Sequence, residues 1–307
     1  MLEQATILVG TDLTEHSTAA VEAASAIAKR FGARRLVLVH GVRDAPFAGL
    51  GEGAARALGR AQMSTEALRA QVAREMAEEG SAVNVTSVVR SGRPAQVLVE
   101  SAEEQSAALV VVSSHGYGSL RRALVGSVAA ETVRAARCPV LVVGPNRSGR
   151  GRIEAITAAV DLSPVSERVL ASAVAFGSAY DAPVRAITVC EAAGLLVSDV
   201  GGFPGATPGE IDIIRAEQRE GLAKLATTDP NHGVEVEAEL LEGAYPPDVI
   251  LQDVARTAAS LVVVGTSGQD AWHRFVLGST ADHVLSEAPC PVLVVPFASP
   301  ALEPSAV

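Results

Sequence analysis

The hexapeptide Cys138-Pro139-Val140-Leu141-Val142-Val143 occurs a second time as Cys290-Pro291-Val292-Leu293-Val294-Val295, 152 residues later (290 − 138). Two further blocks recur in the same order at the same distance: Gly126-Ser127 returns as Gly278-Ser279, and Leu109–Val112 returns as Leu261–Val264. Several blocks at one offset indicate a duplication, and the period is far longer than the roughly 20–50 residues of a solenoid repeat. The chain therefore contains two copies of one domain.

The domain boundaries follow from the repeat and from local composition. The chain has 307 residues, which fits two domains of ordinary size. We predict a first domain over residues 1–144 and a second over 153–297. Residues 145–152 are polar and rich in turn formers, as expected of a linker, and residues 298–307 are expected to form a flexible tail.

Each half alternates strand and helix patterns. In the first half we predict strands over 6–10, 35–42, 83–90, 109–112 and 140–143, and helices over 15–31, 60–79, 94–104 and 126–136. In the second half the predicted strands cover 153–160, 184–190, 234–241, 261–264 and 292–295. Short, continuous Val, Leu and Ile runs are typical of strands buried on both faces. The pattern predicts an α/β fold of two doubly wound domains, each a parallel sheet with helices on both faces.

Bulk composition excludes several classes of function. The formal net charge is −10, with 25 Lys and Arg against 35 Asp and Glu residues, which disfavours nucleic acid as a partner. Three widely spaced cysteines, Cys138, Cys190 and Cys290, indicate neither a disulfide framework nor a zinc site and fit a reducing compartment. We find no signal peptide and no apolar run long enough to span a membrane, so we expect a cytoplasmic protein.

The second half contains the parts of a phosphate-binding turn. Gly265 and Gly268 follow the predicted strand 261–264, nine residues intervene, and Gly278, Ser279 and Thr280 open the last predicted helix. Glycine lets the backbone approach phosphate oxygens, and a helix start offers unpaired N–H groups and a positive dipole end. The alternative is a plain glycine turn, with Ser279 and Asp282 forming a capping box.

The first half repeats this arrangement with one departure. Gly116, Gly126 and Ser127 match their counterparts, but Ser113 stands where the second half has Gly265. If that position needs a positive φ angle or a very close backbone approach, serine is unfavourable there. The first phosphate-binding turn is therefore expected to be weaker or empty.

In each half, one aspartate stands at the end of the first predicted strand. Asp12 and Asp161 lie at the edge where a parallel sheet presents residues to a ligand, and a carboxylate there can accept hydrogen bonds from ribose hydroxyls. The alternative is that each aspartate caps the following helix. The nine-residue loops carry cationic or titratable side chains that would either neutralise phosphate or face solvent: His115, Arg121, Arg122, His273 and Arg274.

Other catalytic motifs are missing from the sequence. It contains no Gly-x-x-x-x-Gly-Lys-Ser/Thr, Gly-x-Ser-x-Gly, His-Glu-x-x-His or Cys-x-x-Cys pattern. We assign no catalytic residue and no metal ligand. The sequence favours a protein that is not an enzyme.

Taken together, these blocks resemble the universal stress protein family. Its ATP-binding pattern Gly-x2-Gly-x9-Gly-Ser matches Gly265 to Ser279 in full. Residues 7–12 resemble the family's opening strand, and residues 36–40 resemble its second strand. Residues 92–94 and 243–246 resemble the turn before its third helix, and the two CPVLVV copies resemble its closing strand. The resemblance covers nearly the whole chain twice, and for each domain we expect a five-stranded sheet in the order 3-2-1-4-5.

The resemblance implies an adenine-nucleotide site in each half. Asp12 and Asp161, with Thr11, would contact adenosine, and Val189 would pack near adenine, where the first half has Gly41. The phosphates would be held by Gly116, Gly126, Ser127 and Val128 in the first half, and by Gly265, Gly268, Gly278, Ser279 and Thr280 in the second. The implied ligand is ATP, with Mg²⁺ expected beside the triphosphate.

The resemblance also implies a role and a mode of assembly. The role is that of a nucleotide-binding regulator or sensor in the stress response, with a downstream protein partner that the sequence does not identify. The alternatives are an interaction module that binds no nucleotide and a slow ATPase. The two fifth strands, 140–143 and 292–295, are expected to pair within one chain, covering two sheet edges, and two chains to form a homodimer.

Overall fold

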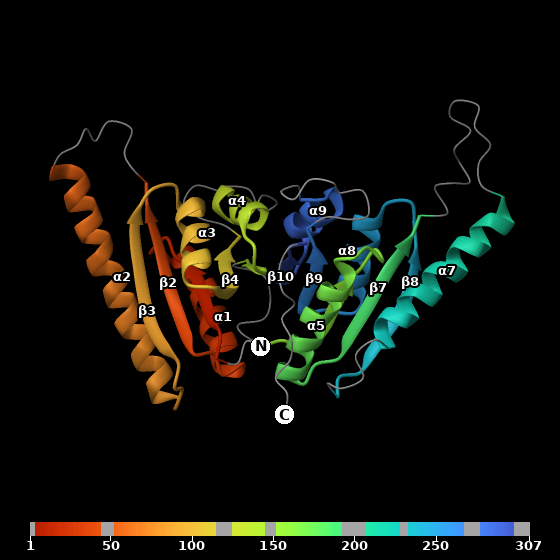
Figure 1. Ribbon diagram of the computed structural model, residues 1–307, viewed down its shortest axis with the longest axis horizontal. Coiled ribbons are helices and arrows are strands. Elements are labelled where there is room, and N and C mark those ends of the chain that lie inside the picture. Colours follow the sequence, from red (N-terminus) through yellow and green to blue (C-terminus); the bar gives the residue numbers. More distant parts are fainter. Residues whose placement is uncertain are drawn as a thin grey trace.

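The computed structural model describes residues 4–43, 52–114, 125–144, 152–191, 207–227, 233–266 and 277–297. Within these residues the strands form a ten-stranded sheet in the order β3-β2-β1-β4-β5-β10-β9-β6-β7-β8. Each half contributes a parallel sheet in the order 3-2-1-4-5, and Figure 1 shows the two halves side by side with α2 and α7 at the outer ends. The predicted α/β class with helices on both faces of the sheet is confirmed.

The described residues of the first half form five strands and four α-helices: β1 (Thr6–Gly10), α1 (Thr18–Arg30), β2 (Arg35–Val42), α2 (Glu52–Glu78), β3 (Asn84–Ser91), α3 (Pro94–Glu104), β4 (Ala107–Ser113), α4 (Ser127–Ala135) and β5 (Val140–Val143). A short 3-10 helix, η1 (Glu15–Ser17), precedes α1. The second half contains β6 (Ile156–Ala159), α5 (Ser166–Tyr180), β7 (Val184–Cys190), α7 (Pro208–Thr227), β8 (Val236–Glu242), α8 (Pro246–Arg256), β9 (Leu261–Gly265), α9 (Ser279–Glu287) and β10 (Val292–Val295).

The largest difference from the predicted elements lies in α2. We expected this helix to begin near residue 60, but it begins at Glu52. The segment is rich in Ala, Glu, Arg and Leu, which are strong helix formers. Their combined preference extends the helix back through two glycines, each of which costs about 1 kcal/mol in a helix interior.

Two hydrophobic layers enclose the sheet. Ile7 and Val9 of β1 face the layer formed with α1, α2, α5 and α7, whereas Leu8 faces the layer formed with α3, α4, α8 and α9. All three side chains are fully buried. Burial on both faces explains why the strands are continuously apolar rather than alternating.

The two halves join through the sheet and through both helix layers. β5 pairs with β10 in antiparallel register, with Leu141 opposite Leu293. On one face Phe31, which directly follows α1, packs edge-to-face against Phe176 of α5, with ring centroids 5.1 Å apart. On the other face Arg134 of α4 lies 3.3 Å from a carboxylate oxygen of Asp282 in α9. The strand pairing covers the β5 and β10 edges, which would otherwise be open to another chain.

None of the helices that the structure describes is both long and apolar enough to cross a bilayer. The residues expected to form the tail, and all of the expected linker except Arg152, lie outside the described ranges.

Candidate functional site

In each half, the last helix begins beside the carboxyl end of a central strand. The Gly126 amide donates to the Ser114 carbonyl at 2.6 Å, and the Gly278 amide donates to the Thr266 carbonyl at the same distance. Ser114 and Thr266 directly follow β4 and β9. These bonds anchor the starts of α4 and α9 at the sheet edge where ligands of doubly wound folds bind.

The starts of α4 and α9 have no side-chain cap. Gly126 and Gly278 are the N-cap residues, both with extended backbone (φ −60° and ψ 147°; φ −62° and ψ 151°). The predicted capping box at Ser279 is wrong, because the Asp282 side chain points instead to Arg134 of the first half. Within the described part of the chain, neither N-cap side chain accepts a first-turn amide, so these amides can serve an anion.

Asp12 and Asp161 form equivalent turns after β1 and β6. The Oδ1 atom of Asp12 accepts the amide and hydroxyl of Thr14 at 3.0 and 2.7 Å. The Oδ1 atom of Asp161 accepts the Ser163 amide at 3.0 Å and the Ser166 hydroxyl at 3.1 Å. Neither aspartate is a helix N-cap, since those positions belong to Thr14 for η1 and Val165 for α5. The helix-capping alternative is therefore wrong.

The second carboxylate oxygen of Asp12, Oδ2, is buried and accepts no hydrogen bond from the residues that the structure describes. Burial alone would raise the pKa of Asp12, but the hydrogen bonds from Thr14, with Ser17 and His16 close by, outweigh it and hold this pKa below its ordinary value. The side chain is therefore a carboxylate at neutral pH. A buried carboxylate oxygen without a donor is a position that a ligand hydroxyl would satisfy.

Thr11 supports this turn from inside. It is buried, its hydroxyl lies 2.9 Å from that of Ser17, and it accepts the Leu13 amide at 3.0 Å. The Thr11 carbonyl lies 2.7 Å from His40 Nδ1, and in the second half Thr188 donates to the Val160 carbonyl at 2.6 Å. In both halves, then, a side chain of the second strand fixes the end of the first.

Local packing explains why the first half has Ser113 where the second half has Gly265. Neither Ser113 nor Gly265 has a positive φ angle, so the backbone strain we anticipated for serine is absent. A Cβ atom on Gly265 would lie 2.8 Å from Cγ1 of Val165. In the first half the residue equivalent to Val165 is His16, whose backbone carbonyl accepts the Ser113 hydroxyl at 2.7 Å. Each pair of residues is therefore matched within its own half.

Packing also explains why residue 41 is a glycine. A Cβ atom at this position would lie 2.7 Å from the Cα atom of Pro94, the first residue of α3. The missing side chain therefore lets the start of α3 approach the end of β2. The second half has Val189 at the equivalent position in β7, and this side chain packs against the hydrophobic layer of α8 and α9.

A cavity of about 380 Å³, which we call the first crevice, opens beside the start of α4. It is lined by Arg43, Gly92, Arg93, Pro94, Ala95, Ser127, Val128 and Glu131. Arg43 directly follows β2, and Arg93 directly precedes α3. Two predicted phosphate-binding residues, Ser127 and Val128, thus share a cavity with two arginines that the sequence reasoning missed. Both arginines directly adjoin a strand or helix end, and that position is the signal that could have found them.

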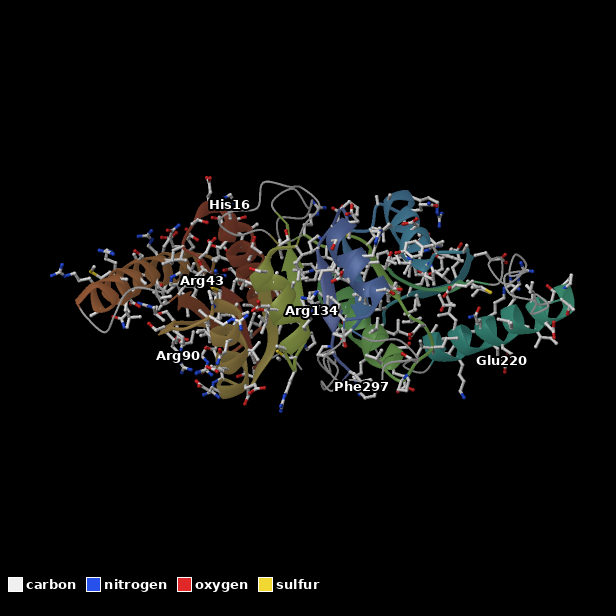
Figure 2. All side chains as sticks on the ribbon, turned by 90° about the horizontal axis from the view of Figure 1, so that it is seen from above. His16, Arg43, Arg90, Arg134, Glu220 and Phe297 are labelled. Carbon is white, nitrogen blue, oxygen red and sulfur yellow. The ribbon has the colours of Figure 1, made fainter. Side chains whose placement is uncertain are left out.

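The charges around the first crevice favour an anion. The starts of both α3 and α4 border it, and neither helix has an acidic residue in its first turn. The Arg93 guanidinium lies 3.0 and 3.1 Å from the carboxylate oxygens of Glu131. No ion pair between described residues involves Arg43, whose side chain is drawn in Figure 2. Helix N-termini and a guanidinium together form an ordinary phosphate-binding environment.

The corresponding edge of the second half, at the starts of α8 and α9, carries different side chains, and we call the position equivalent to the first crevice the second crevice. Tyr245 replaces Arg93, and its ring lies 5.6 Å from that of His283, the counterpart of Glu131. His283 Nε2 lies 3.6 Å from Oδ1 of Asp248, which is in the first turn of α8. The first turn of α9 contains Asp282, and Glu191 directly follows β7 at the position equivalent to Arg43.

The universal stress protein family model matches the chain twice, over residues 5–144 and 152–296. The chain belongs to the universal stress protein family. It is 32% identical over 227 residues to a universal stress protein of Mycobacterium tuberculosis, and the match covers 73% of each chain. It is 33% identical over 151 residues to one of Methanocaldococcus jannaschii, and that match covers 48% of this chain and 85% of the relative.

Among solved structures, a universal stress protein from Archaeoglobus fulgidus aligns with a TM-score of 0.68 at 18% identity, covering 96% of this chain and 97% of its own. At this identity the likeness concerns the fold. A further universal stress protein, solved in complex with cAMP, is 27% identical over 45% of this chain and 96% of its own, with a TM-score of 0.35.

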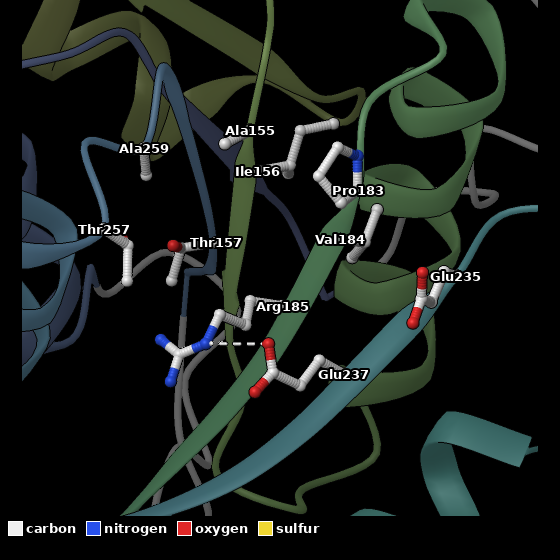
Figure 3. Close-up of a pocket in the computed structure, with 10 residues that line it drawn as sticks. All are labelled: Ala155, Ile156, Thr157, Pro183, Val184, Arg185, Glu235, Glu237, Thr257 and Ala259. Atoms are coloured by element: carbon white, nitrogen blue, oxygen red, sulfur yellow. Dashed lines mark ion pairs between the residues drawn. The ribbon is translucent and has the colours of Figure 1, made fainter.

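This universal stress protein has a second cavity, of about 280 Å³, at the opposite end of the sheet (Figure 3). It lies beside the first residues of β6 and β7, and its central side chain is Arg185. The guanidinium contacts both oxygens of buried Asp253 at 2.8 and 2.7 Å and also pairs with Glu237 and Glu239. Arg256 also pairs with Asp253 and Glu239, so that two arginines face three carboxylates. The network links β7, β8 and α8, and we interpret it as structural.

Several predicted residues of the universal stress protein lie outside the described ranges. They are Gly116, Gly268 and the loop side chains His115, Arg121, Arg122, His273 and Arg274. Among the residues that the structure describes, no three His, Cys, Asp or Glu side chains gather closely enough to hold a metal ion.

Proposed function

We propose that this universal stress protein binds an adenine nucleotide at the carboxyl edge of each half and acts in the stress response as a nucleotide-binding regulator or sensor. The observation that carries the proposal is the first crevice. It combines the uncapped start of α4, the start of α3, and the arginines Arg43 and Arg93 in one cavity of about 380 Å³. A cavity of this size lies within the usual range for small-molecule sites.

The phosphate end of the nucleotide would lie at the start of α4. There the amides after Gly126 and the hydroxyl of Ser127 can donate to phosphate oxygens, while Arg43 supplies an opposing charge. In the second half Gly278, Ser279 and Thr280 offer the same donors at the start of α9. Mg²⁺ would accompany a triphosphate, with water and phosphate oxygens as most of its ligands.

The nucleoside end would lie toward Asp12 and Asp161. The free Oδ2 atom of Asp12 is an acceptor for a ribose hydroxyl, and the Thr14 bonds to Oδ1 hold the carboxylate in position. In the second half Val189 would pack near the base. The first half has Gly41 there, so its base would make fewer apolar contacts.

Binding rather than rapid turnover fits the chemistry of Asp12. A carboxylate whose pKa lies below its ordinary value is a weak general base, since efficient bases have a pKa near the working pH. Its role would be to hold the ligand. A slow ATPase, or an interaction module that binds no nucleotide, then becomes an outcome of the test.

The test begins with protein purified without added nucleotide, then denatured and analysed for released AMP, ADP and ATP. Calorimetric titration with each nucleotide follows, for the wild type and for the Gly126→Val, Gly278→Val double variant. We expect binding to the wild type and at least a tenfold loss in the double variant, because valine crowds both helix starts. No bound nucleotide and a flat titration of the wild type would refute the proposal. Loss of bound ATP on long incubation, with release of phosphate, would indicate the ATPase.

A further inference from the structure

The two crevices, which share one backbone, differ in charge. At five equivalent positions the first half has Arg43, Arg93, Gln96, Ala130 and Glu131, and the second half has Glu191, Tyr245, Asp248, Asp282 and His283. The first set contains two cations and one carboxylate. The second contains three carboxylates and no arginine.

The carboxylates of the second half lie where they oppose an anion most. Asp248 and Asp282 are in the first turns of α8 and α9, the helices equivalent to α3 and α4. A carboxylate in the first turn offsets the positive end of the helix dipole. Arg134 compensates Asp282 in part, at 3.3 Å, but both side chains are about half exposed. Water weakens the attraction between two such exposed charges.

In the first half, no first-turn carboxylate offsets the helix dipoles of α3 and α4. The first turns of α3 and α4 contain no acidic residue, and Glu131, which pairs with Arg93, lies in the second turn of α4. Arg43 then adds an exposed positive charge to the same cavity. Clefts lined with charge of one sign concentrate ligands of the other sign.

We propose that the two halves divide nucleotides by charge. This inference rests on the proposed function, because it names which nucleotide each crevice prefers. The first crevice binds the free polyphosphate form, with affinity rising from AMP through ADP to ATP. The second crevice prefers nucleotides with little phosphate charge, and accepts ATP when Mg²⁺ neutralises part of that charge. The glycine pattern alone favours the second half for ATP, whereas the charges of the lining favour the first.

The experiment separates the crevices with variants that close one of them. The Gly278→Val chain keeps the first crevice, and the Gly126→Val chain keeps the second. Each is titrated by calorimetry with AMP, ADP and ATP in EDTA at one fixed pH. We expect ATP to bind at least about tenfold more tightly than AMP in the Gly278→Val chain. In the Gly126→Val chain we expect ATP to bind no more tightly than AMP until Mg²⁺ is added.

Reversing the charge of one exposed residue in each crevice gives a more specific test. Arg43→Glu, in the Gly278→Val chain, should lower the affinity for ATP roughly three- to tenfold and that for AMP less than about twofold. Glu191→Arg, in the Gly126→Val chain, should raise the affinity for ATP by a similar factor. The same exchanges made in the otherwise wild-type chain give the result independently, should either valine variant fail to fold.

Matched controls change net charge equally, away from both crevices. Arg74→Glu on α2 and Glu220→Arg on α7 are exposed, and Figure 2 shows Glu220 on α7, far from the join between the halves. These variants should leave every affinity within about twofold of its parent. Equal ATP-to-AMP preference in the two crevices, or charge exchanges no larger than the controls, would overturn the inference while leaving nucleotide binding intact. Absence of all binding to the wild type would instead overturn the proposed function.

Discussion

The two halves of the molecule have the same backbone at the sheet edge and different side chains around it. Leu13 and Leu162 have the same positive φ angle of 62°, and the amides of Gly126 and Gly278 make the same 2.6 Å hydrogen bond. By contrast, the ion pair of Arg93 with Glu131 is replaced by the ring contact of Tyr245 with His283. The duplication has thus kept the backbone hydrogen bonds at this edge and changed the charged side chains beside them.

Neighbouring residues have changed together. Ser113 accompanies His16, whereas Gly265 accompanies Val165, because a side chain at 265 would meet the Val165 methyl group. The departure of the first half from the glycine pattern therefore reflects local packing and does not by itself imply loss of a ligand. Moving residues between the halves tests this reading most directly.

Gly41→Val, which copies Val189 into the first half, should have the largest effect on stability. Its Cβ atom would lie 2.7 Å from the Cα atom of Pro94, so backbone atoms must move. We expect the free energy of unfolding to fall by about 3 kcal/mol, at the upper end for overpacking. Urea denaturation followed by circular dichroism measures it, with Val189→Gly as the reciprocal change. A loss below about 0.5 kcal/mol would mean that α3 does not need this close approach.

Gly265→Ser, which copies Ser113 into the second half, should cost about 1–3 kcal/mol. The new side chain would press on Val165, whose Cγ1 atom lies 2.8 Å from the Cβ position. Adding Val165→Ala should recover part of the loss, and the double-mutant cycle measures that coupling. If the two changes are strictly additive, the packing explanation of the Ser113 departure is wrong.

Asp12→Asn should remove a contribution to stability that depends on pH. Because the pKa of Asp12 is lower in the folded protein, its stabilisation is complete above the pKa of the unfolded chain and is lost as the pH falls through the folded pKa. We expect wild type and variant to differ by about 1 kcal/mol near neutral pH and to converge in strong acid. Urea denaturation at a series of pH values checks this. A constant difference across the series would contradict it.

Glu131→Ala, which removes the partner of Arg93, should have the smallest effect. Arg93 is largely exposed and Glu131 about half exposed, and such pairs contribute about 0–1 kcal/mol. Ligand binding should respond more clearly, since Arg93 is then released toward the first crevice and ATP affinity should rise about two- to fivefold. His283→Ala is the matched change in the second half and should leave ATP affinity in EDTA within about twofold. Calorimetry with ATP measures both variants.

The sequence predicted the fold closely because its signals are local. The CPVLVV copies, the buried Val runs and Pro94 at a helix start each specify one element, and α3 has the predicted bounds Pro94–Glu104. The error in α2 arose where two glycines were outweighed by distant helix formers. Arg43 and Arg93 were missed because their approach to Ser127 depends on how β2, α3 and α4 pack, which no sequence spacing records.

The most direct test of the account is a crystal structure of the wild-type chain grown with excess ATP and EDTA. We predict phosphate density at the start of α4, within hydrogen-bond distance of the amides after Gly126 and beside Arg43, with a ribose hydroxyl near Oδ2 of Asp12. A first crevice without nucleotide, or one filled by side chains of the protein itself, would contradict it.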